Sequence, residues 1–215
     1  MKNRFELLIF DWDGTLMDSI GWIVHCLQTA ADRTGCPIPT PDAAKDVIGL
    51  SIIRAMESLF PEAGPELREQ LIRTYSQEYA SRTLGPGDLF IGVRDMLEEL
   101  NRTGYRLAVA TGKTRAGLQK ALLATKTENL FDITRTADET ASKPDPKMLQ
   151  EIMSHLEVAP ARTLMIGDSS HDLQMAQNAQ ISAIGVACGA HSEEILQQYQ
   201  PLLCLQQPAE LLNII

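Results

Sequence analysis

The stretch FELLIFDWDGTLMDS, residues 5–19, decides the fold, because it combines a buried strand with the acidic turn that ends it. Its first six residues are mostly apolar and too few for an independent helix, which is typical of a strand covered on both faces. Since side chains alternate along a strand, Asp11 and Asp13 should point to one side, while Trp12 points to the other and packs. Gly14 then permits a turn that a side chain would hinder.

Apolar segments of strand length recur along the chain and alternate with helical patterns. They are FELLIF (5–10), RLAVA (106–110), TLMI (163–166), SAIGVA (182–187) and LLCL (202–205). The alternation predicts an α/β fold with a Rossmann-like three-layer core, in which helices cover both faces of a parallel sheet. In such sheets, ligands bind at the carboxyl ends of the strands.

Residues 17–83 interrupt this alternation, because they contain helical patterns and no convincing strand. Pro65 is well placed for the start of one of these helices. We therefore expect an all-helical cap domain over 17–83, inserted into an α/β catalytic core domain formed by 1–16 and 84–215. The glycine-rich beginning of the second core segment would serve as the hinge on the return crossing.

The composition excludes several classes of protein. The chain has 215 residues, of which 44% are hydrophobic and 22% charged, as in an ordinary globular protein. Its net charge of −9 argues against nonspecific binding to nucleic acid or to an anionic membrane. No apolar run approaches the roughly 18 residues of a membrane span, and the N-terminus offers no signal-peptide cleavage site. We expect a cytoplasmic protein, either a monomer or a homodimer, with reduced cysteines.

Polar residues follow two further predicted strands at the point where each strand ends. Thr111 and Gly112 follow the second strand and precede a helical pattern, so a hydroxyl and free backbone amides could bind an anion there. Asp168 ends the strand TLMI, and Asp172 lies four residues on, at the opening of the next helix. We therefore expect these carboxylates to reach the same edge of the sheet as those of the first strand.

This predicted cluster of acids suits a divalent cation. Two carboxylates at one strand end repel each other, so a cation should lie near Asp11 and Asp13, or one of them should carry a proton. Oxygen ligands of this kind favour Mg²⁺. Lys143, held in a non-helical segment by the proline that follows it, adds a positive charge. Together with a protonated Asp13, these charges would attract an anionic phosphate, as phosphoryl transfer requires.

Four segments resemble, in order, the sequential motifs of the haloacid dehalogenase-like hydrolase superfamily: FDWDGTLMDS (10–19), VATGK (109–113), SKPDP (142–146) and MIGDSSHD (165–172). The resemblance is closest to the phosphoglycolate-phosphatase-like branch, whose members carry a helical cap after the first strand. It covers almost the whole chain, and its first motif is highly specific. One departure is Gln180, at a position where the family commonly places glycine.

The resemblance implies a Mg²⁺-dependent phosphatase that hydrolyses a small phosphorylated metabolite. Asp11 would be the nucleophile that forms a phospho-aspartate, as well as a metal ligand. Asp13 would be the general acid and base, and would offer its backbone carbonyl to the metal. Lys143 would neutralise the transferring phosphoryl group and orient Asp11.

The resemblance also implies the remaining ligands of the site. Thr111 and Gly112 would bind the transferring phosphoryl group. Asp168 would bind Mg²⁺ directly, and Asp172 would help to hold it through a water molecule. Within the same motifs, we expect Asp18 and Ser19 to cap a helix and His171 to be exposed to solvent.

The loop formed by Gly49, Leu50 and Ser51 in the cap is a candidate for substrate selection, because such caps close over the site and contact the leaving group. Lys45 and Arg54 lie near it in the sequence. The alternative is that this segment only packs between two helices and leaves its cations exposed.

Three other functions compete with hydrolysis of a monoester. A sugar phosphomutase would use the same motifs with a cap that admits sugar hydroxyls. A phospho-accepting signalling domain also combines acids, a threonine and a lysine, but it is shorter and lacks an inserted cap. A catalytically silent binding protein gains no support, because all the acids are present. Asp13 argues against dehalogenase chemistry, whose enzymes lack this second acid.

Overall fold

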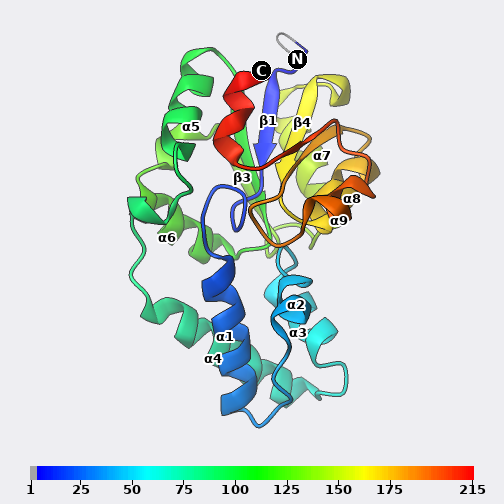
Figure 1. Ribbon diagram of the computed structural model, residues 1–215. Helices are drawn as coiled ribbons and strands as arrows, with labels where there is room; N and C mark the ends of the chain where they lie inside the picture. Colours follow the sequence, from blue (N-terminus) through cyan, green and yellow to red (C-terminus); the bar gives the residue numbers. More distant parts are fainter. Residues whose placement is uncertain (1–3) are drawn as a thin grey trace.

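The computed structural model describes residues 4–215 and contains a six-stranded parallel sheet next to a separate group of helices (Figure 1). The strand order is β3-β2-β1-β4-β5-β6. The strands are β1 (Leu7–Phe10), β2 (Arg106–Thr111), β3 (Ile133–Thr136), β4 (Thr163–Gly167), β5 (Ser182–Val186) and β6 (Cys204–Leu205). The predicted α/β class with a parallel sheet is confirmed.

The central position of β1 brings the motifs together. Phe10, its last residue, is in register with Val109 of β2 on one side and with Ile166 of β4 on the other. The backbone N–H of Asp11 continues this ladder by donating to the carbonyl of Ile166 at 2.9 Å. The carboxyl ends of β1, β2 and β4 therefore share one edge of the sheet, and this edge faces the helical region (Figure 1).

Helices cover both faces of the sheet, as three layers require. One face carries α5 (Val93–Arg102), α6 (Arg115–Thr125) and the 3₁₀ helix η4 (Pro208–Asn213), and the other carries α7 (Lys147–Leu156), α8 (Ser170–Asn178) and α9 (Glu193–Gln197). Alternate side chains of β1 supply both cores: Leu8 and Phe10 pack on the first face, Leu7 and Ile9 on the second. Trp12 continues the first set, is fully buried, and packs as expected.

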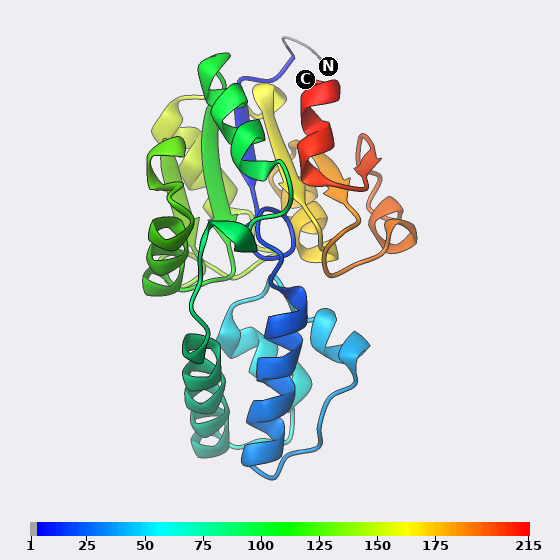
Figure 2. The ribbon, with the colours of Figure 1, turned by 60° about the vertical axis from the view of Figure 1, so that its left-hand side comes forward.

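The inserted helices form a second core of their own. They are α1 (Ile20–Arg33), α2 (Pro41–Lys45), α3 (Ile52–Leu59) and α4 (Pro65–Ser81), all between β1 and β2 in the chain. Figure 2 shows the long helices α1 and α4 side by side at the end of the molecule away from the two termini. Their apolar faces meet in one cluster, which Ala190 of the sheet domain joins. The domain limits at 17 and 83 stay a prediction; the side chain of Met17 packs within the core of the sheet domain.

The chain returns to the sheet through the 3₁₀ helix η1 (Pro86–Asp88). Two further 3₁₀ turns, η2 (Glu128–Leu130) and η3 (Pro160–Arg162), precede β3 and β4. The sequence did not predict β3, because this edge strand reads ITRT and three of its four residues are only partly buried. It is a strand because its backbone pairs with β2, although its sequence lacks the hydrophobic pattern of a buried strand.

The turn after α8 preserves the backbone shape that glycine favours. Gln180 has a φ of 57°, within the left-handed region, although it carries a side chain. The departure from the family pattern therefore leaves the path from α8 into β5 intact. A non-glycine residue in this conformation costs free energy, on the order of 1 kcal/mol.

Two leucines in helices test the role of the core. Leu97 of α5 is fully buried, whereas Leu123 of α6 is 54% exposed. We expect Leu97→Ala to lower the free energy of unfolding by about 2–5 kcal/mol, because it removes packed methyl groups and leaves a cavity. Leu123→Ala should cost less than about 1 kcal/mol. Urea denaturation of both variants measures the difference, and equal losses would contradict this assignment of the core.

Candidate active site

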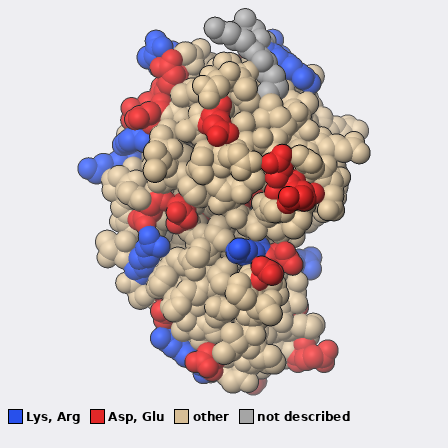
Figure 3. Space-filling model, in the orientation of Figure 1, with Lys and Arg blue, Asp and Glu red and all other residues tan. Residues whose placement is uncertain are grey.

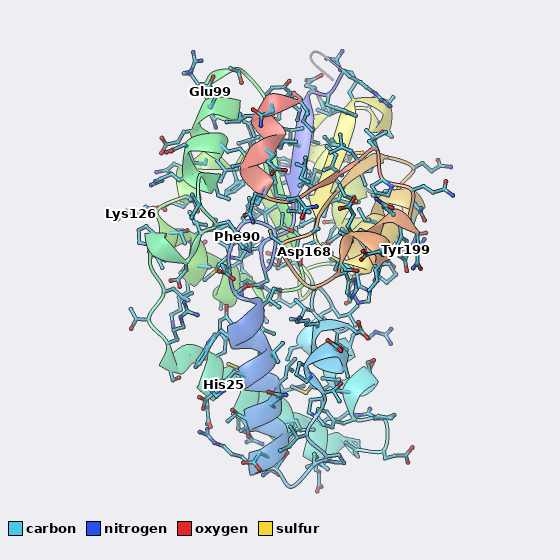
Figure 4. All side chains as sticks on the ribbon, in the orientation of Figure 1. His25, Phe90, Glu99, Lys126, Asp168 and Tyr199 are labelled. Atoms are coloured by element: carbon cyan, nitrogen blue, oxygen red, sulfur yellow. The ribbon has the colours of Figure 1, made fainter. Side chains whose placement is uncertain are left out.

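Three buried carboxylates meet at the edge of the sheet that faces the cap. Asp11 follows β1, Asp168 follows β4, and Asp172 lies in the first turn of α8. One oxygen atom of each lies within 4.8 Å of the others, and all three side chains are buried. Figure 4 shows Asp168 at the junction between the sheet and the helical region. The structure therefore brings Asp11 together with two acids that lie more than 150 positions further along the sequence.

Lys143 joins two of these acids. Its Nζ lies 2.6 Å from Asp11 Oδ1 and 2.6 Å from Asp172 Oδ1, and its side chain has no exposed surface. The lysine is held in a loop before α7, where the Lys143–Pro144 peptide bond is cis. A buried ammonium needs such partners, because an unpaired charge in the protein interior is very costly. The contact with Asp11 is the one that the predicted orienting role of Lys143 would use, and that role stays a prediction.

The charges of this cluster favour a bound cation. Burial raises the pKa of Asp11 to about 7, an effect that Lys143 opposes and Asp172 reinforces. Burial, together with the charges of Asp11 and Asp172, also raises the pKa of Asp168 well above its usual range. When the three carboxylates are ionised, the cluster with its one ammonium has a net charge of −2. A divalent cation among the carboxylate oxygens would balance them, so the donor set fits such an ion.

Asp168 is held in place by hydrogen bonds and by two glycines. Its Oδ1 accepts a hydrogen bond from Thr15 Oγ1 at 2.6 Å, and its Oδ2 accepts one from the backbone N–H of Ala190 at 2.7 Å. A Cβ atom at Gly14 or at Gly189 would lie only 2.1 Å from Oδ2. Gly14 also has a φ of +83°. Glycine is therefore needed after Asp13 both for the turn and for the close approach of Asp168.

Asp172 has two distinct partners. Its Oδ2 accepts hydrogen bonds from Ser169 Oγ at 2.6 Å and from the backbone N–H of Ser169 at 3.1 Å, which completes a capping box at the start of α8. Its Oδ1 faces Lys143. The structural role at the helix terminus and the contact with the charged cluster thus coexist in one side chain.

Asp13 lies beside this cluster and is bound by different groups. Its Oδ1 accepts a hydrogen bond from Ser19 Oγ at 2.6 Å, and its Oδ2 lies 2.9 Å from Lys113 Nζ. Lys113 also donates to Tyr79 Oη of α4 at 2.8 Å. The prediction that Ser19 caps a helix was wrong: Ser19 precedes α1, but its hydroxyl binds Asp13 and makes no capping hydrogen bond.

Thr111 and Gly112 form the third part of this edge. Thr111 ends β2, is buried, and its Oγ1 accepts a hydrogen bond from the backbone N–H of Lys113 at 3.2 Å. Gly112 lies against the cap: a Cβ atom there would come within 2.4 Å of the carbonyl oxygen of Leu50 and 2.5 Å of that of Gly49. The absence of a side chain at this position therefore allows the cap loop to approach the sheet.

A cavity of about 330 Å³ lies between the cap and this edge. Its lining includes Asp11 and Asp13 of the sheet domain and Gly49 and Leu50 of the cap. Ser51, the third residue of the predicted selection loop, is not part of this lining. Its hydroxyl caps α3, and its backbone N–H donates to Ser142 Oγ at 2.9 Å.

The cap cations named from the sequence do not line this cavity. Arg54 instead pairs with Glu57 on the exposed side of α3 at 3.3 Å, and Lys45 is likewise absent from the lining. The lysines of the lining are Lys113 and Lys120, which both belong to the sheet domain. The spacing of residues in the cap sequence could not reveal which cations line the cavity, because both lysines reach it from the sheet domain.

Two histidines next to the carboxylates contact the cap. His171 Nε2 lies 2.8 Å from the carbonyl oxygen of Asp46, and His191 Nε2 lies 3.3 Å from Asp46 Oδ1. The backbone N–H of Ser170 donates to His191 Nδ1 at 2.9 Å. Burial lowers the pKa of His191, partly opposed by Asp46. The expectation that His171 would simply face solvent was wrong, because it contacts the cap.

Sequence reasoning assigned no role to Lys113, Tyr79, Thr15 and His191. A signal existed for Lys113 and Thr15, since both lie within quoted motifs. Tyr79 and His191 lie far from any motif. The packing of the cap against the sheet brings Tyr79 to the site, whereas hydrogen bonds to Asp168 and Ser170 within the sheet domain hold His191 there.

Comparisons with known proteins agree with this geometry. The family model for haloacid dehalogenase-like hydrolases matches residues 8–186. The chain belongs to this family. It is 35% identical to probable phosphatase IndB of Dickeya dadantii, over 96% of this chain and 92% of that protein. It is 27% identical to the phosphoglycolate phosphatase of Vibrio vulnificus, over 100% of this chain and 97% of that protein. Among solved structures, a hydrolase from Pseudomonas syringae superposes with a TM-score of 0.87 at 26% identity, covering 97% and 96% of the two chains.

These findings confirm that this haloacid dehalogenase-like protein is an enzyme, a hydrolase that acts on phosphate esters. The resemblance to phosphoglycolate-phosphatase-like proteins is confirmed as well. Within residues 4–215, the helices are too short or too polar to cross a membrane.

Two glycines test the contact between the cap and the sheet. We expect Gly112→Ala to lower kcat/KM for 4-nitrophenyl phosphate at least about tenfold, because the added methyl group displaces the cap backbone from the site. Gly21→Ala in α1 is the matched control, since a Cβ atom there meets nothing within 4 Å. The control should keep its activity, and a thermal melt would show whether both variants are folded. Wild-type kinetics in folded Gly112→Ala would contradict the tight contact.

Proposed function

We propose that this enzyme is a Mg²⁺-dependent phosphatase that hydrolyses a small phosphate monoester through an aspartyl phosphate on Asp11. One observation carries the proposal: Asp11, which is buried in a cluster with Asp168, Asp172 and Lys143, lies in the lining of the cavity beneath the cap. A phosphoryl group placed there would meet a carboxylate nucleophile, a cation and a water-poor surrounding at the same time.

Asp11, Asp168 and Asp172 would hold the magnesium ion, with the backbone carbonyl of Asp13 as a further ligand. Burial is the main cause of the raised pKa values of Asp11 and Asp168, and neighbouring carboxylates add to it. A cation bound among these oxygens would favour their ionised forms, which supports the assignment. When bound, the ion neutralises charge on the phosphate and orients it for displacement.

The first chemical step belongs to Asp11 and Asp13. A carboxylate oxygen of Asp11 attacks phosphorus and forms a P–O bond, while the bond from phosphorus to the leaving oxygen breaks. Asp13 gives its proton to that oxygen, which departs as an alcohol. In the second step, Asp13 takes a proton from water, and the resulting hydroxide releases inorganic phosphate from Asp11.

Lys143, Thr111 and Gly112 would position the phosphoryl group. The ammonium of Lys143 touches Asp11 directly and can balance the charge on the equatorial oxygens. The hydroxyl of Thr111 and the backbone N–H of Gly112 lie at the end of β2, next to the same cavity. Donors fixed by the fold in this way need little reorganisation during the reaction.

The surface agrees with a small substrate. On the face drawn in Figure 3, acidic and basic side chains are interspersed and form no continuous basic stripe. The net charge of −9 also disfavours a polyanionic partner. A phosphorylated metabolite that fits beneath the cap is therefore the proposed substrate class. The cytoplasmic location and the monomeric or dimeric state remain predictions.

Two aspartates of the first motif test the nucleophile. Asp11→Asn should lower kcat at least about 10³-fold, because the amide cannot form the phospho-enzyme. Asp18→Asn is the matched control, because Asp18 is exposed and its side chain lies outside the cluster. Phosphate release with 4-nitrophenyl phosphate measures both variants, and circular dichroism checks folding. Activity of Asp11→Asn above a tenth of the wild-type value would refute the assignment.

Removal of the metal tests the other half of the proposal. Dialysis against EDTA should abolish phosphate release, and Mg²⁺ should restore it. Mg²⁺ should also raise the melting temperature of the metal-free protein, since a ligand that binds only the folded state stabilises it. In Asp168→Asn the shift should become much smaller, because one of the three carboxylates is lost. Full activity after exhaustive chelation would show that the reaction proceeds without a metal.

A further inference from the structure

The cap presents an almost entirely apolar wall to the cavity. Within the part of the chain that the structure describes, the cap residues of the lining include no charged side chain. Leu27 of α1, Val47 of the loop after α2 and Ala55 of α3 are examples, and all three are buried. Such side chains form no hydrogen bonds, so they stabilise a bound group by removing its apolar surface from water.

The polar side chains of this wall are few, and most already have a partner. The hydroxyl of Ser76 donates to the carbonyl of Ile72, one turn earlier in α4, at 2.7 Å. Tyr79 Oη accepts a hydrogen bond from Lys113 at 2.8 Å. Among the described residues, the hydroxyl of Tyr75 has no hydrogen-bond partner, although Tyr75 also lines the cavity. Burial raises the pKa of Tyr75, so this hydroxyl stays protonated and can donate to a bound molecule.

The charged groups of the cavity lie on the sheet side, where the phosphoryl group would bind. Asp11 belongs to the buried cluster, and Lys113 Nζ lies 2.9 Å from Asp13 as well as close to Tyr79. Lys120 occupies an exposed position of α6. A substrate whose phosphate meets Asp11 therefore extends its leaving group toward the apolar wall of the cap.

We propose that this enzyme acts on phosphate esters of uncharged, largely apolar alcohols, and that Tyr75 binds a single neutral polar substituent on them. This inference rests on the proposed phosphatase function, since it concerns the leaving group of that reaction. A polyol would lose its hydrogen bonds to water on entering the cavity and would regain few from the cap. An apolar ring would bury its surface against the wall without that loss.

Two esters with the same carbon ring test the apolar wall. Cyclohexyl phosphate and myo-inositol 1-phosphate differ only by the hydroxyl groups of the inositol ring. With Mg²⁺ present, the wild-type enzyme should prefer cyclohexyl phosphate by at least about tenfold in kcat/KM, because the inositol hydroxyls would be buried without partners. These hydroxyls make the inositol alkoxide the better leaving group, so intrinsic reactivity does not produce the preference. A smaller preference, or the reverse one, overturns the inference and leaves the phosphatase function standing.

A hydroxyl placed in the wall tests whether the cap causes this preference. Val47→Thr keeps the shape of the side chain and adds a polar atom, so it should lower the preference at least about threefold. Val158→Thr makes the same change at a buried position of the sheet domain outside the lining, and it should keep the wild-type preference. If a thermal melt shows that Val47→Thr does not fold, Ala55→Ser introduces a hydroxyl into the same wall. An unchanged preference in the folded cap variant would overturn the role of the wall.

Esters with one additional hydroxyl test Tyr75. The 2-, 3- and 4-hydroxycyclohexyl phosphates place this group at different distances from phosphorus. Tyr75→Phe should reduce kcat/KM for the best of the three at least about fivefold more than for cyclohexyl phosphate, because a hydrogen bond is lost. Tyr105→Phe is the matched control, since the hydroxyl of Tyr105 also lacks a hydrogen-bond partner among the described residues but lies outside the lining. An equal change for all four esters in Tyr75→Phe would overturn the role of Tyr75.

The two proposals fail in different ways. If 4-nitrophenyl phosphate is hydrolysed but the preference for cyclohexyl phosphate is absent, only the inference is overturned. If the wild type with Mg²⁺ releases phosphate neither from 4-nitrophenyl phosphate nor from any of the other esters, the proposed function fails as well.

Discussion

The ion pairs of Lys143 with Asp11 and Asp172 are the interaction on which the arrangement of the site depends. They link the end of β1 to the first turn of α8 through a lysine from a third segment, all within the protein interior. Burial of several carboxylates in one place is unfavourable, and the raised pKa of Asp11 expresses this cost. One ammonium relieves part of it, and the remaining negative charge makes the cluster suited to a divalent cation.

Close backbone packing gives this cluster its shape. Asp168 fits between two glycines, and Gly167 leaves only enough room for the side chain of Asp172. A methyl group at any of these positions would overlap a carboxylate of the cluster. The sheet therefore acts as a rigid frame, and the acids are positioned by steric limits as much as by their hydrogen bonds.

The cap completes the site from the other side. Gly49 and Leu50 pack against Gly112, Asp46 meets two histidines, and Tyr79 reaches Lys113. Most of these contacts between the cap and the sheet domain are polar. The packing of Ala190 into the cap core is an apolar one. Interfaces of this kind allow domains to move relative to each other, which suits a cap that admits a substrate and then excludes water.

The sequence by itself determined the α/β class, the insertion of helices after the first strand, and the edge at which Asp11, Thr111 and Asp168 meet. It could do so because the carboxyl ends of parallel strands share one edge, so local patterns imply a distant juxtaposition. Only the tertiary structure decided that β3 completes the sheet, that Ser19 and Lys113 bind Asp13, and that Tyr79 faces the cavity. The position of Tyr79 depends on how the cap packs on the sheet, and the other contacts depend on strand pairing and on the paths of the loops after β1 and β2; no local pattern along the chain records that geometry.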